Sequence, residues 1–195
     1  LKPSEITPGI GLALGRLCRE AGIPDGVVSV LSGSGAETGA AIVCHPDVRM
    51  VAFTGGTETG RSIARAAAEK LMPAALELGG KSPHIVFADA DLDAACDAVA
   101  GGIFASMGQS CVAGSRLFVE RGVYGRVVEA VVARARAYRI GPPDEAATEL
   151  GPLASFAHRD RVEVLVESAR GEGGRVLCGG ARPAGLERGA YFSPT

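Results

Sequence analysis

Short apolar runs rich in β-branched residues alternate along this chain with longer stretches of helical periodicity. A short apolar run between turn residues indicates a buried strand, and an apolar period of about 3.6 residues indicates a helix. Strands are predicted at residues 27–31, 48–53, 84–87, 116–119 and 175–178. Helices are predicted at residues 7–21, 35–44, 59–72, 92–107, 124–138 and 158–170, with a Gly/Pro-rich loop at 141–153. This alternation restricts the chain to folds in which helices connect and cover strands.

The order of these elements predicts an α/β protein with open, doubly wound parallel sheets, because strands joined through a helix run parallel. The pattern restarts after Gly79, so we expect one domain at residues 1–79 and a second at residues 80–195. Such sheets bind ligands beyond the C-terminal ends of their strands. The loop at residues 54–60 lies at such an end, directly before a predicted helix.

The composition argues against several classes of protein. Of the 195 residues, 47% are hydrophobic and 22% are charged, which is typical of a globular chain rather than a disordered one. The net charge of −2 and the scattered basic residues argue against nucleic acid or an acidic membrane surface as a partner. No apolar stretch approaches the roughly 18 residues of a membrane-spanning helix, and no signal-peptide pattern opens the sequence.

The five cysteines are odd in number, lie far apart and include no Cys-x-x-Cys pair. This argues against a disulfide scaffold or a zinc site and for a reducing compartment, so a cytoplasmic location is expected. The three histidines have no metal-ligand spacing, and no metal site is predicted. Four cysteines are expected to be buried apolar side chains: Cys18, Cys44, Cys96 and Cys178.

The fifth cysteine, Cys111, lies in a loop of small residues at positions 108–116. Glu77 lies in a second unusual run, at positions 76–83, beside two glycines. A thiol and a carboxylate, each set among glycines where backbone can approach a ligand closely, suggest covalent thiol chemistry with a nearby base. Each signal alone is modest, because a single cysteine is more often a small core residue.

Four motifs occur in one order along the chain. Lys-Pro-Ser-Glu occupies residues 2–5, Phe-Thr-Gly-Gly-Thr-Glu-Thr-Gly residues 53–60, Leu-Glu-Leu-Gly-Gly-Lys-Ser-Pro residues 76–83 and Gly-Gln-Ser-Cys-Val-Ala-Gly-Ser-Arg residues 108–116. Together they resemble the motifs of the NAD(P)-dependent aldehyde dehydrogenase superfamily. The resemblance extends over the whole chain, which corresponds to a central fragment covering less than half of a typical member.

The resemblance implies that residues 1–79 form the C-terminal part of a Rossmann-like, NAD-binding domain. It implies that residues 80–195 form the N-terminal part of the catalytic domain. The implied reaction is oxidation of an aldehyde to its carboxylic acid with hydride transfer to NAD. Cys111 would carry a covalent thioester, and Glu77 would act as the general base for its hydrolysis.

The resemblance also implies a set of cofactor-binding residues: Lys2, Glu5, Phe53, Thr54, Gly55, Gly56, Thr57, Gly60, Leu78 and Gly79. A glycine loop before a helix can present backbone N–H groups and the helix dipole to a pyrophosphate. Gly56 replaces the serine that is usual in the family, which removes one hydroxyl from the phosphate contacts. Glu5 can accept both ribose hydroxyls and would repel a 2′-phosphate, so NAD is favoured over NADP.

Two other functions stay open at this point. One is an enzyme of another reaction class in the same family, either a coenzyme A-acylating semialdehyde dehydrogenase or an esterase acting through Cys111. Glu77 argues against the acylating version, because acylating members typically lack this glutamate. The other is a non-catalytic nucleotide-binding module. For the dehydrogenase we expect a small-molecule aldehyde as substrate, a homodimer or homotetramer at full length, and little or no turnover by this fragment alone.

Overall fold

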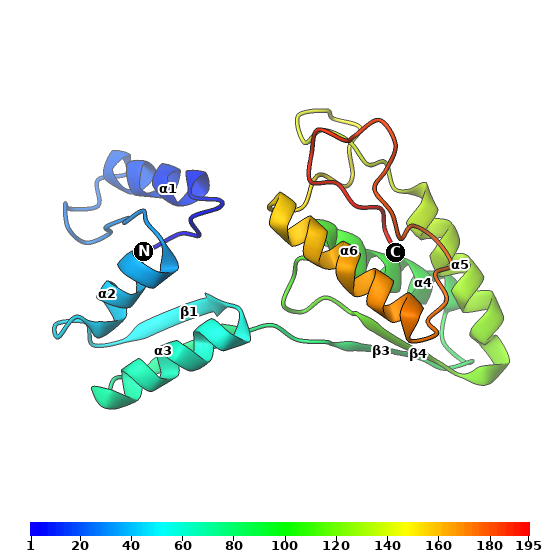
Figure 1. The fold of residues 1–195 in the computed structure, drawn as a ribbon, viewed down its shortest axis with the longest axis horizontal. Helices are drawn as coiled ribbons and strands as arrows, with labels where there is room; N and C mark the ends of the chain where they lie inside the picture. Colours follow the sequence, from blue (N-terminus) through cyan, green and yellow to red (C-terminus); the bar gives the residue numbers. More distant parts are fainter. The chain divides into compact units, whose positions relative to one another are not determined.

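A computed structural model describes all residues from Leu1 to Thr195 and divides into two compact units, Leu1–Gly79 and Gly80–Thr195. Each unit contains one pair of parallel strands joined through a helix (Figure 1). The predicted α/β class with open parallel sheets is therefore confirmed. None of the helices combines the length and the apolar character needed to span a bilayer.

The first unit is built around a β-α-β crossover. Its elements are α1 (Gly9–Glu20), a π-helical turn η1 (Gly35–Gly39), α2 (Ala40–Cys44), β1 (Val51–Gly55), α3 (Thr57–Glu69) and β2 (Ala74–Leu78). Because β2 runs parallel to β1, the C-terminal ends of both strands and the start of α3 lie at one edge of the sheet. A small core of Val43, Ala67 and Met72 joins α2 to α3. The crossover thus places the end of β2 beside the loop that follows β1.

The second unit repeats this arrangement and adds helices. Its elements are β3 (Pro83–Val86), α4 (Leu92–Phe104), a 3-10 turn η2 (Ala105–Gly108), β4 (Arg116–Val119), a 3-10 turn η3 (Arg121–Val123), α5 (Tyr124–Ala137) and α6 (Phe156–Gly171). Strand β4 runs parallel to β3. Val86 of β3, Cys96 of α4 and Val127 of α5 belong to one buried apolar cluster, so α4 and α5 pack on the sheet.

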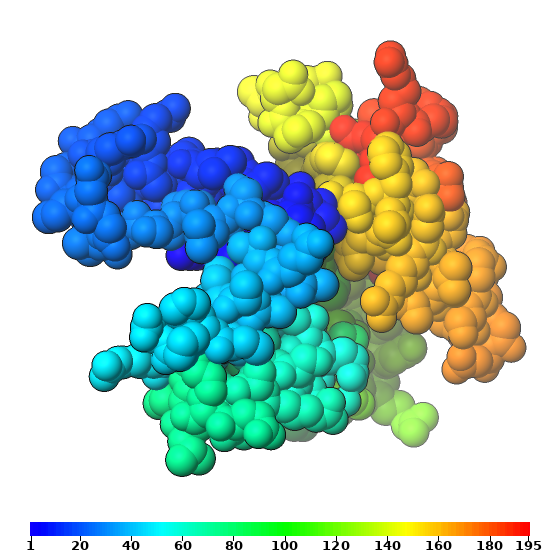
Figure 2. Space-filling model, turned by 60° about the vertical axis from the view of Figure 1, so that its left-hand side comes forward, coloured from blue at the N-terminus to red at the C-terminus, as the bar shows by residue number.

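The final segment of the chain lies along α6. Arg159, which is 7% exposed, forms an ion pair with Asp160 and donates a hydrogen bond to the carbonyl of Gly189 at 3.4 Å. The N–H of Leu153 donates to the carbonyl of Ala190 at 2.9 Å, which ties the same segment to the loop before α6. Figure 2 shows α6 (yellow to orange) beside the last residues of the chain (red).

Two predicted strands are wrong. At residues 27–31, the segment pairs only with Leu1. The Leu1 ammonium donates to the carbonyl of Ser29, and the Leu1 carbonyl accepts from the N–H of Leu31. A strand needs a longer partner, so the ladder stops there. At residues 175–178 no backbone group pairs with another strand, and the carbonyl of Leu177 instead accepts a hydrogen bond from the guanidinium of Arg136.

One strand, β2, was not predicted from the sequence. Its residues, Ala-Ala-Leu-Glu-Leu, are all good helix formers. The segment is nevertheless extended because it pairs along its whole length with β1, from Ala74 opposite Val51 to Leu78 opposite Gly55. Tertiary pairing therefore overrides the local helical preference of these residues.

The helix predicted at residues 92–107 ends earlier, at Phe104. Ser106 and Met107 have φ values of 52° and 57°, and Gly108 has a φ of 72°, so three consecutive residues adopt the left-handed region. A non-glycine side chain is strained in this region, and an α-helix cannot continue through it. The chain therefore turns sharply three residues before Cys111.

Candidate active site

Cys111 lies in the loop between η2 and β4, and it is exposed. The N–H of Ala113 donates to the carbonyl of Ser110 at 3.2 Å, which closes a tight turn around the cysteine. The Ser110 hydroxyl accepts a further hydrogen bond from the N–H of Val112 at 3.4 Å. Cys111 is thus exposed on a turn in which its two neighbours, Ser110 and Val112, are hydrogen-bonded to each other.

The start of this loop is held by the side chain of Gln109. Its amide nitrogen donates to the carbonyl of Ser106 at 3.2 Å, and its amide oxygen accepts from the N–H of Ala154 at 2.9 Å. One amide therefore connects the left-handed turn at residues 106–108 to the loop that precedes α6. This contact gives a structural reason for a glutamine two residues before the cysteine.

The end of the loop is held by the sheet. Arg116 donates from its backbone N–H to the carbonyl of Ser82 at 3.3 Å and from its Nε to the carbonyl of Lys81 at 2.6 Å. A Cβ placed on Gly80 would come within 3.0 Å of the Cys111 carbonyl oxygen. The Gly-Lys-Ser run at residues 80–82 is therefore the backbone support of the cysteine loop within the second unit.

The other predicted catalytic residue, Glu77, lies on β2 in the first unit. It is the penultimate residue of the strand and is in register with Thr54 of β1. Leu78 is in register with Gly55, and a Cβ placed on Gly60 would lie 2.5 Å from the Leu78 side chain. The fold therefore brings Glu77 and the residues of the predicted cofactor loop to one sheet edge.

The predicted cofactor loop is shorter than the sequence indicates, because α3 begins at Thr57 rather than at residue 59. Phe53, Thr54 and Gly55 end β1, Gly56 is the N-cap of α3, and Thr57 and Gly60 lie in its first turn. No side chain caps this helix. The Gly60 N–H donates to the carbonyl of Gly56 at 2.9 Å, but the N–H groups of residues 57–59 have no partner and remain free for an anionic ligand, as a pyrophosphate would require.

Lys2 and Glu5 lie together in the segment that precedes α1. The Lys2 ammonium donates to the carbonyl of Gly33 at 2.9 Å and lies 3.5 Å from the Glu5 carboxylate. The backbone N–H of Glu5, then that of Gly35 and then Lys2 lower the pKa of the Glu5 carboxyl below its ordinary value of 4.5. Glu5 is thus held as a carboxylate, the form that can accept ribose hydroxyls.

The cysteines differ in environment from the sequence expectation. Cys96 is 1% exposed and lies in the core, as predicted. Cys44 is exposed at the C-terminal end of α2, and Cys18 and Cys178 are only half-buried. The burial prediction is wrong for these three because each lies on a helix or segment with one face uncovered.

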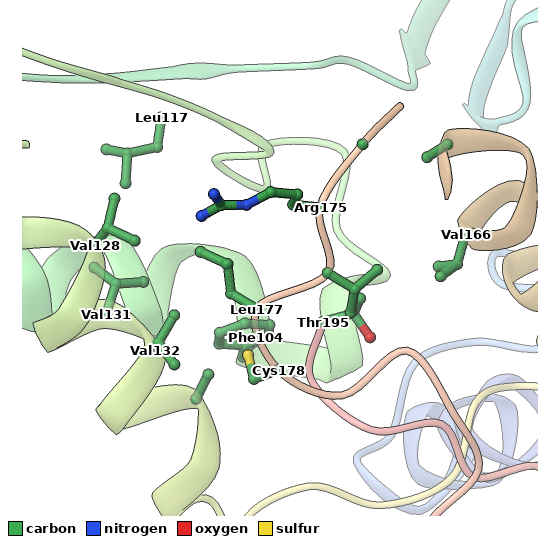
Figure 3. A pocket seen from close by; sticks show the side chains of 14 residues that line it. Phe104, Leu117, Val128, Val131, Val132, Val166, Arg175, Leu177, Cys178 and Thr195 are labelled. Carbon is green, nitrogen blue, oxygen red and sulfur yellow. The ribbon is translucent and has the colours of Figure 1, made fainter. Parts of the chain in front are cut away.

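Two cavities, of about 390 and 380 Å³, lie in the second unit. The first is apolar and is lined by Val128, Val131 and Val132 of α5 together with Phe104 and the segment at residues 174–178 (Figure 3). The second is lined in part by Gly108 and Gln109. Cys111 lines neither cavity, so neither of them presents the thiol to a substrate.

Sequence reasoning missed His84, which it treated only as a structural histidine. His84 lies on β3, and its ring fills the space beside Gly102 of α4 and Gly114 of the cysteine loop. Its Nε2 atom is buried and has no hydrogen-bond partner. The available signal was its place, directly after the Gly-Gly-Lys-Ser-Pro run on the strand that supports the cysteine loop.

Comparisons with known proteins identify the family to which this chain is similar. The model of the aldehyde dehydrogenase family matches residues 1–195. A chloroplastic betaine aldehyde dehydrogenase of Amaranthus hypochondriacus is 43% identical over 195 residues, and a 3,6-anhydro-alpha-L-galactose dehydrogenase of Streptomyces coelicolor is 46% identical over 197 residues. All of this chain is covered in both cases, but only 39% and 40% of the two relatives.

Solved structures give the same result. An aldehyde dehydrogenase of Bacillus cereus in complex with NAD⁺ superposes with a TM-score of 0.96 at 46% identity, over 100% of this chain and 39% of that one. An NAD-dependent aldehyde dehydrogenase of Sinorhizobium meliloti superposes with a TM-score of 0.95 at 42% identity, over 100% and 38%. The chain therefore spans about two fifths of the length of these relatives. It belongs to the aldehyde dehydrogenase family.

Proposed function

We propose that the complete protein oxidises an aldehyde to its carboxylic acid with NAD as the hydride acceptor. The observation that carries this proposal is the exposed Cys111 on a hydrogen-bonded turn, supported by the Gly80 backbone and tied down by Gln109. A nucleophile must be accessible and must be held in one orientation, and this loop provides both. Residues 1–79 are proposed as part of the NAD-binding domain and residues 80–195 as part of the catalytic domain.

The residues of the first unit fit the cofactor. The uncapped first turn of α3 offers backbone N–H groups to the pyrophosphate, with Gly56 leaving the approach open. The Glu5 carboxylate, beside Lys2, can accept the ribose hydroxyls and disfavours a 2′-phosphate. Phe53, Thr54, Gly55, Thr57, Gly60, Leu78 and Gly79 complete the proposed cofactor set. When bound, NAD supplies the acceptor for the hydride.

Cys111 is proposed to act as the nucleophile. Its thiolate Sγ forms a bond to the carbonyl carbon of the aldehyde, and the carbonyl oxygen takes the negative charge of the tetrahedral adduct. Loss of the hydride from this carbon re-forms the carbonyl and leaves a thioester on Sγ. The exposure of Cys111 leaves this residue accessible to the aldehyde.

Glu77 is proposed to act in the second half of the reaction. Its carboxylate takes a proton from water as the water oxygen attacks the thioester carbon. The carbon–sulfur bond then breaks, the carboxylic acid leaves and the Cys111 thiolate is regenerated. The overall reaction consumes one aldehyde, one NAD and one water, and it yields one acid, one NADH and one proton.

The test is NADH formation by the full-length protein at saturating NAD across a panel of aldehydes. Turnover that disappears in Cys111→Ala and falls sharply in Glu77→Gln supports the proposal. Turnover that requires coenzyme A would indicate the acylating reaction. A folded protein that binds NAD but oxidises no aldehyde would indicate a nucleotide-binding module. The isolated 195-residue chain is proposed to have little or no turnover, because it spans only about two fifths of its relatives.

A further inference from the structure

His84 is the second residue of β3, and its side chain lies on the same face of the strand as Val86. Val86 packs in the buried cluster with α4, so the His84 ring also faces that helix. The exposed residues of β3 are Pro83 and Ile85, on the opposite face. The imidazole therefore lies between the sheet and α4, at the level where the cysteine loop meets the helix.

Two glycines make the room for this ring. A Cβ placed on Gly114 would lie 1.7 Å from Nε2 of His84, and one placed on Gly102 would lie 2.9 Å from the same atom. No side chain can be accommodated at position 114 unless the ring moves. The two glycines also contact each other, because the N–H of Gly114 donates to the carbonyl of Gly102 at 3.1 Å. The ring thus fills the junction between the loop and α4.

This junction is rigidly coupled to Cys111. Ala113, which precedes Gly114, is 6% exposed and donates its N–H to Ser110, so residues 110–114 move as one turn. A shift of the backbone at Gly114 therefore reaches the cysteine. Nε2 of His84 is buried without a partner. A buried unpaired polar atom is unfavourable for stability, so hydrogen bonding at Nε2 does not account for the position of the ring, whereas its packing between the two glycines does.

We propose that His84 is a positioning residue for Cys111: its imidazole, wedged between Gly102 and Gly114, sets the position of the nucleophile loop on α4. The proposal rests on the proposed function, in which the Cys111 thiolate attacks the aldehyde. His84 touches neither the substrate nor the reacting atoms in this role. It acts through the backbone of residues 110–114.

The test uses the full-length protein and five variants: His84→Ala, Gly114→Ala, the double variant His84→Ala/Gly114→Ala, Gly102→Ala and its control Gly101→Ala. Two readouts are measured, the steady-state constants for NADH formation and the rate of Cys111 alkylation by iodoacetamide. The tryptic peptide of residues 82–116 contains both Cys111 and Cys96. Because Cys96 is 1% exposed, its alkylation in the same peptide reports loss of the fold.

The His84→Ala variant lacks the ring between Gly102 and Gly114 and is expected to lower kcat about 10- to 100-fold, because small displacements of a reacting group reduce the rate strongly. The KM for NAD should change less than about twofold. Alkylation of Cys111 is expected to slow by about fivefold or more, with Cys96 still protected. Gly114→Ala is expected to be impaired at least as strongly. Removal of the ring makes room for the new methyl group, so the double variant should recover about tenfold over Gly114→Ala.

Gly101→Ala is the matched control for Gly102→Ala. Both glycines lie in α4, but a Cβ on Gly101 would meet no atom within 4 Å. Both substitutions gain the same helix propensity, so only the contact with His84 differs. We expect Gly102→Ala to slow Cys111 alkylation and Gly101→Ala to leave it unchanged.

Unchanged kcat and alkylation in His84→Ala, or a double variant no better than Gly114→Ala, would overturn the proposal. Alkylation of Cys96 would show that His84→Ala has lost the fold. In that case Gly101→Ala and Gly102→Ala are compared instead, and equal rates of Cys111 alkylation in these two variants would overturn the proposal. If no aldehyde is oxidised even by the unmodified protein, the proposed function fails. The alkylation rates then still decide whether His84 positions the loop.

Discussion

Gly80 lies directly against Cys111: a Cβ at position 80 would stand 3.0 Å from the cysteine's carbonyl oxygen. Gly80 and Cys111 belong to different motifs and are 31 positions apart in the sequence. A backbone atom cannot rotate away as a flexible side chain can, so an added methyl group must displace the loop itself. Gly80 is therefore part of the structure that holds the Cys111 loop.

Gly80→Ala is expected to move the Cys111 carbonyl by a few tenths of an ångström. Since a displacement of about 1 Å can reduce a rate about 100-fold, we expect a loss of about 3- to 10-fold in kcat of the full-length enzyme. Steady-state NADH formation measures it. Gly125→Ala in α5, where a Cβ would meet nothing within 4 Å, is the control and should retain full activity.

Gly56→Ser is expected to tighten NAD binding. Gly56 is the N-cap of α3 and has no side chain near the proposed pyrophosphate position. A hydroxyl there adds one hydrogen bond worth about 0.5–1.5 kcal/mol, which corresponds to a Kd lower by about 2- to 12-fold. Isothermal titration calorimetry of the full-length protein measures this change. A weaker affinity would show that the serine caps the helix in competition with the ligand.

Lys70→Met is expected to destabilise the first unit. The Lys70 ammonium donates to the carbonyls of Val43 at 3.2 Å and Val48 at 3.1 Å, and also to that of His45, so it closes the end of α2. Hydrogen bonds from a charged donor contribute about 1.5–3 kcal/mol, and a loss in this range is expected in the free energy of unfolding by urea.

Arg61→Met is the control for Lys70→Met. Arg61 lies on the same helix and pairs at 2.7 Å with Glu58, but both side chains are well exposed. An exposed pair of this kind contributes about 0–1 kcal/mol, so its removal should be nearly neutral. Equal losses in the two variants would contradict the role given to Lys70.

Glu5 is expected to make stability depend on pH in the acid range. Because its pKa is lowered in the folded protein, the carboxylate contributes stability above the unfolded-state pKa of about 4.5. That contribution is lost as pH falls from there through the lowered folded-state pKa. Urea unfolding of the protein and of Glu5→Gln should therefore differ at about pH 6, where the carboxyl group is ionised, and converge in acid. A difference that grows as the pH falls would contradict this assignment.

The motif residues could be predicted from the sequence, but the contacts that hold them in place could not. The runs around Glu77 and Cys111 mark these two residues as the proposed catalytic groups by local order alone. The roles of Gly102 and Gly114 depend on the His84 ring, which comes from a different strand. A glycine shows in sequence only that a side chain is absent, and the atom that excludes one is visible only after folding.

The secondary structure, too, could be predicted from the sequence only in part. Helices such as α5 follow from their periodicity, and the observed span Tyr124–Ala137 differs by one residue from the prediction. The strand β2 does not follow from it, because Ala74–Leu78 prefers a helix and is extended only through pairing with β1. The left-handed turn at Ser106 and Met107 also opposes local preference. It is held by the two side-chain hydrogen bonds of Gln109, to Ser106 and to Ala154.

The sequence by itself determined the α/β class, the family and the motif in which Cys111 is proposed as the nucleophile, because these depend on residue order and periodicity within short segments. Only the tertiary structure decided which strands form, where the helix before Cys111 ends and which side chain fills the space beneath its loop. The physical reason is that pairing and close packing are set by residues distant in sequence. Gly80 beside Cys111 and His84 between Gly102 and Gly114 are contacts of this kind.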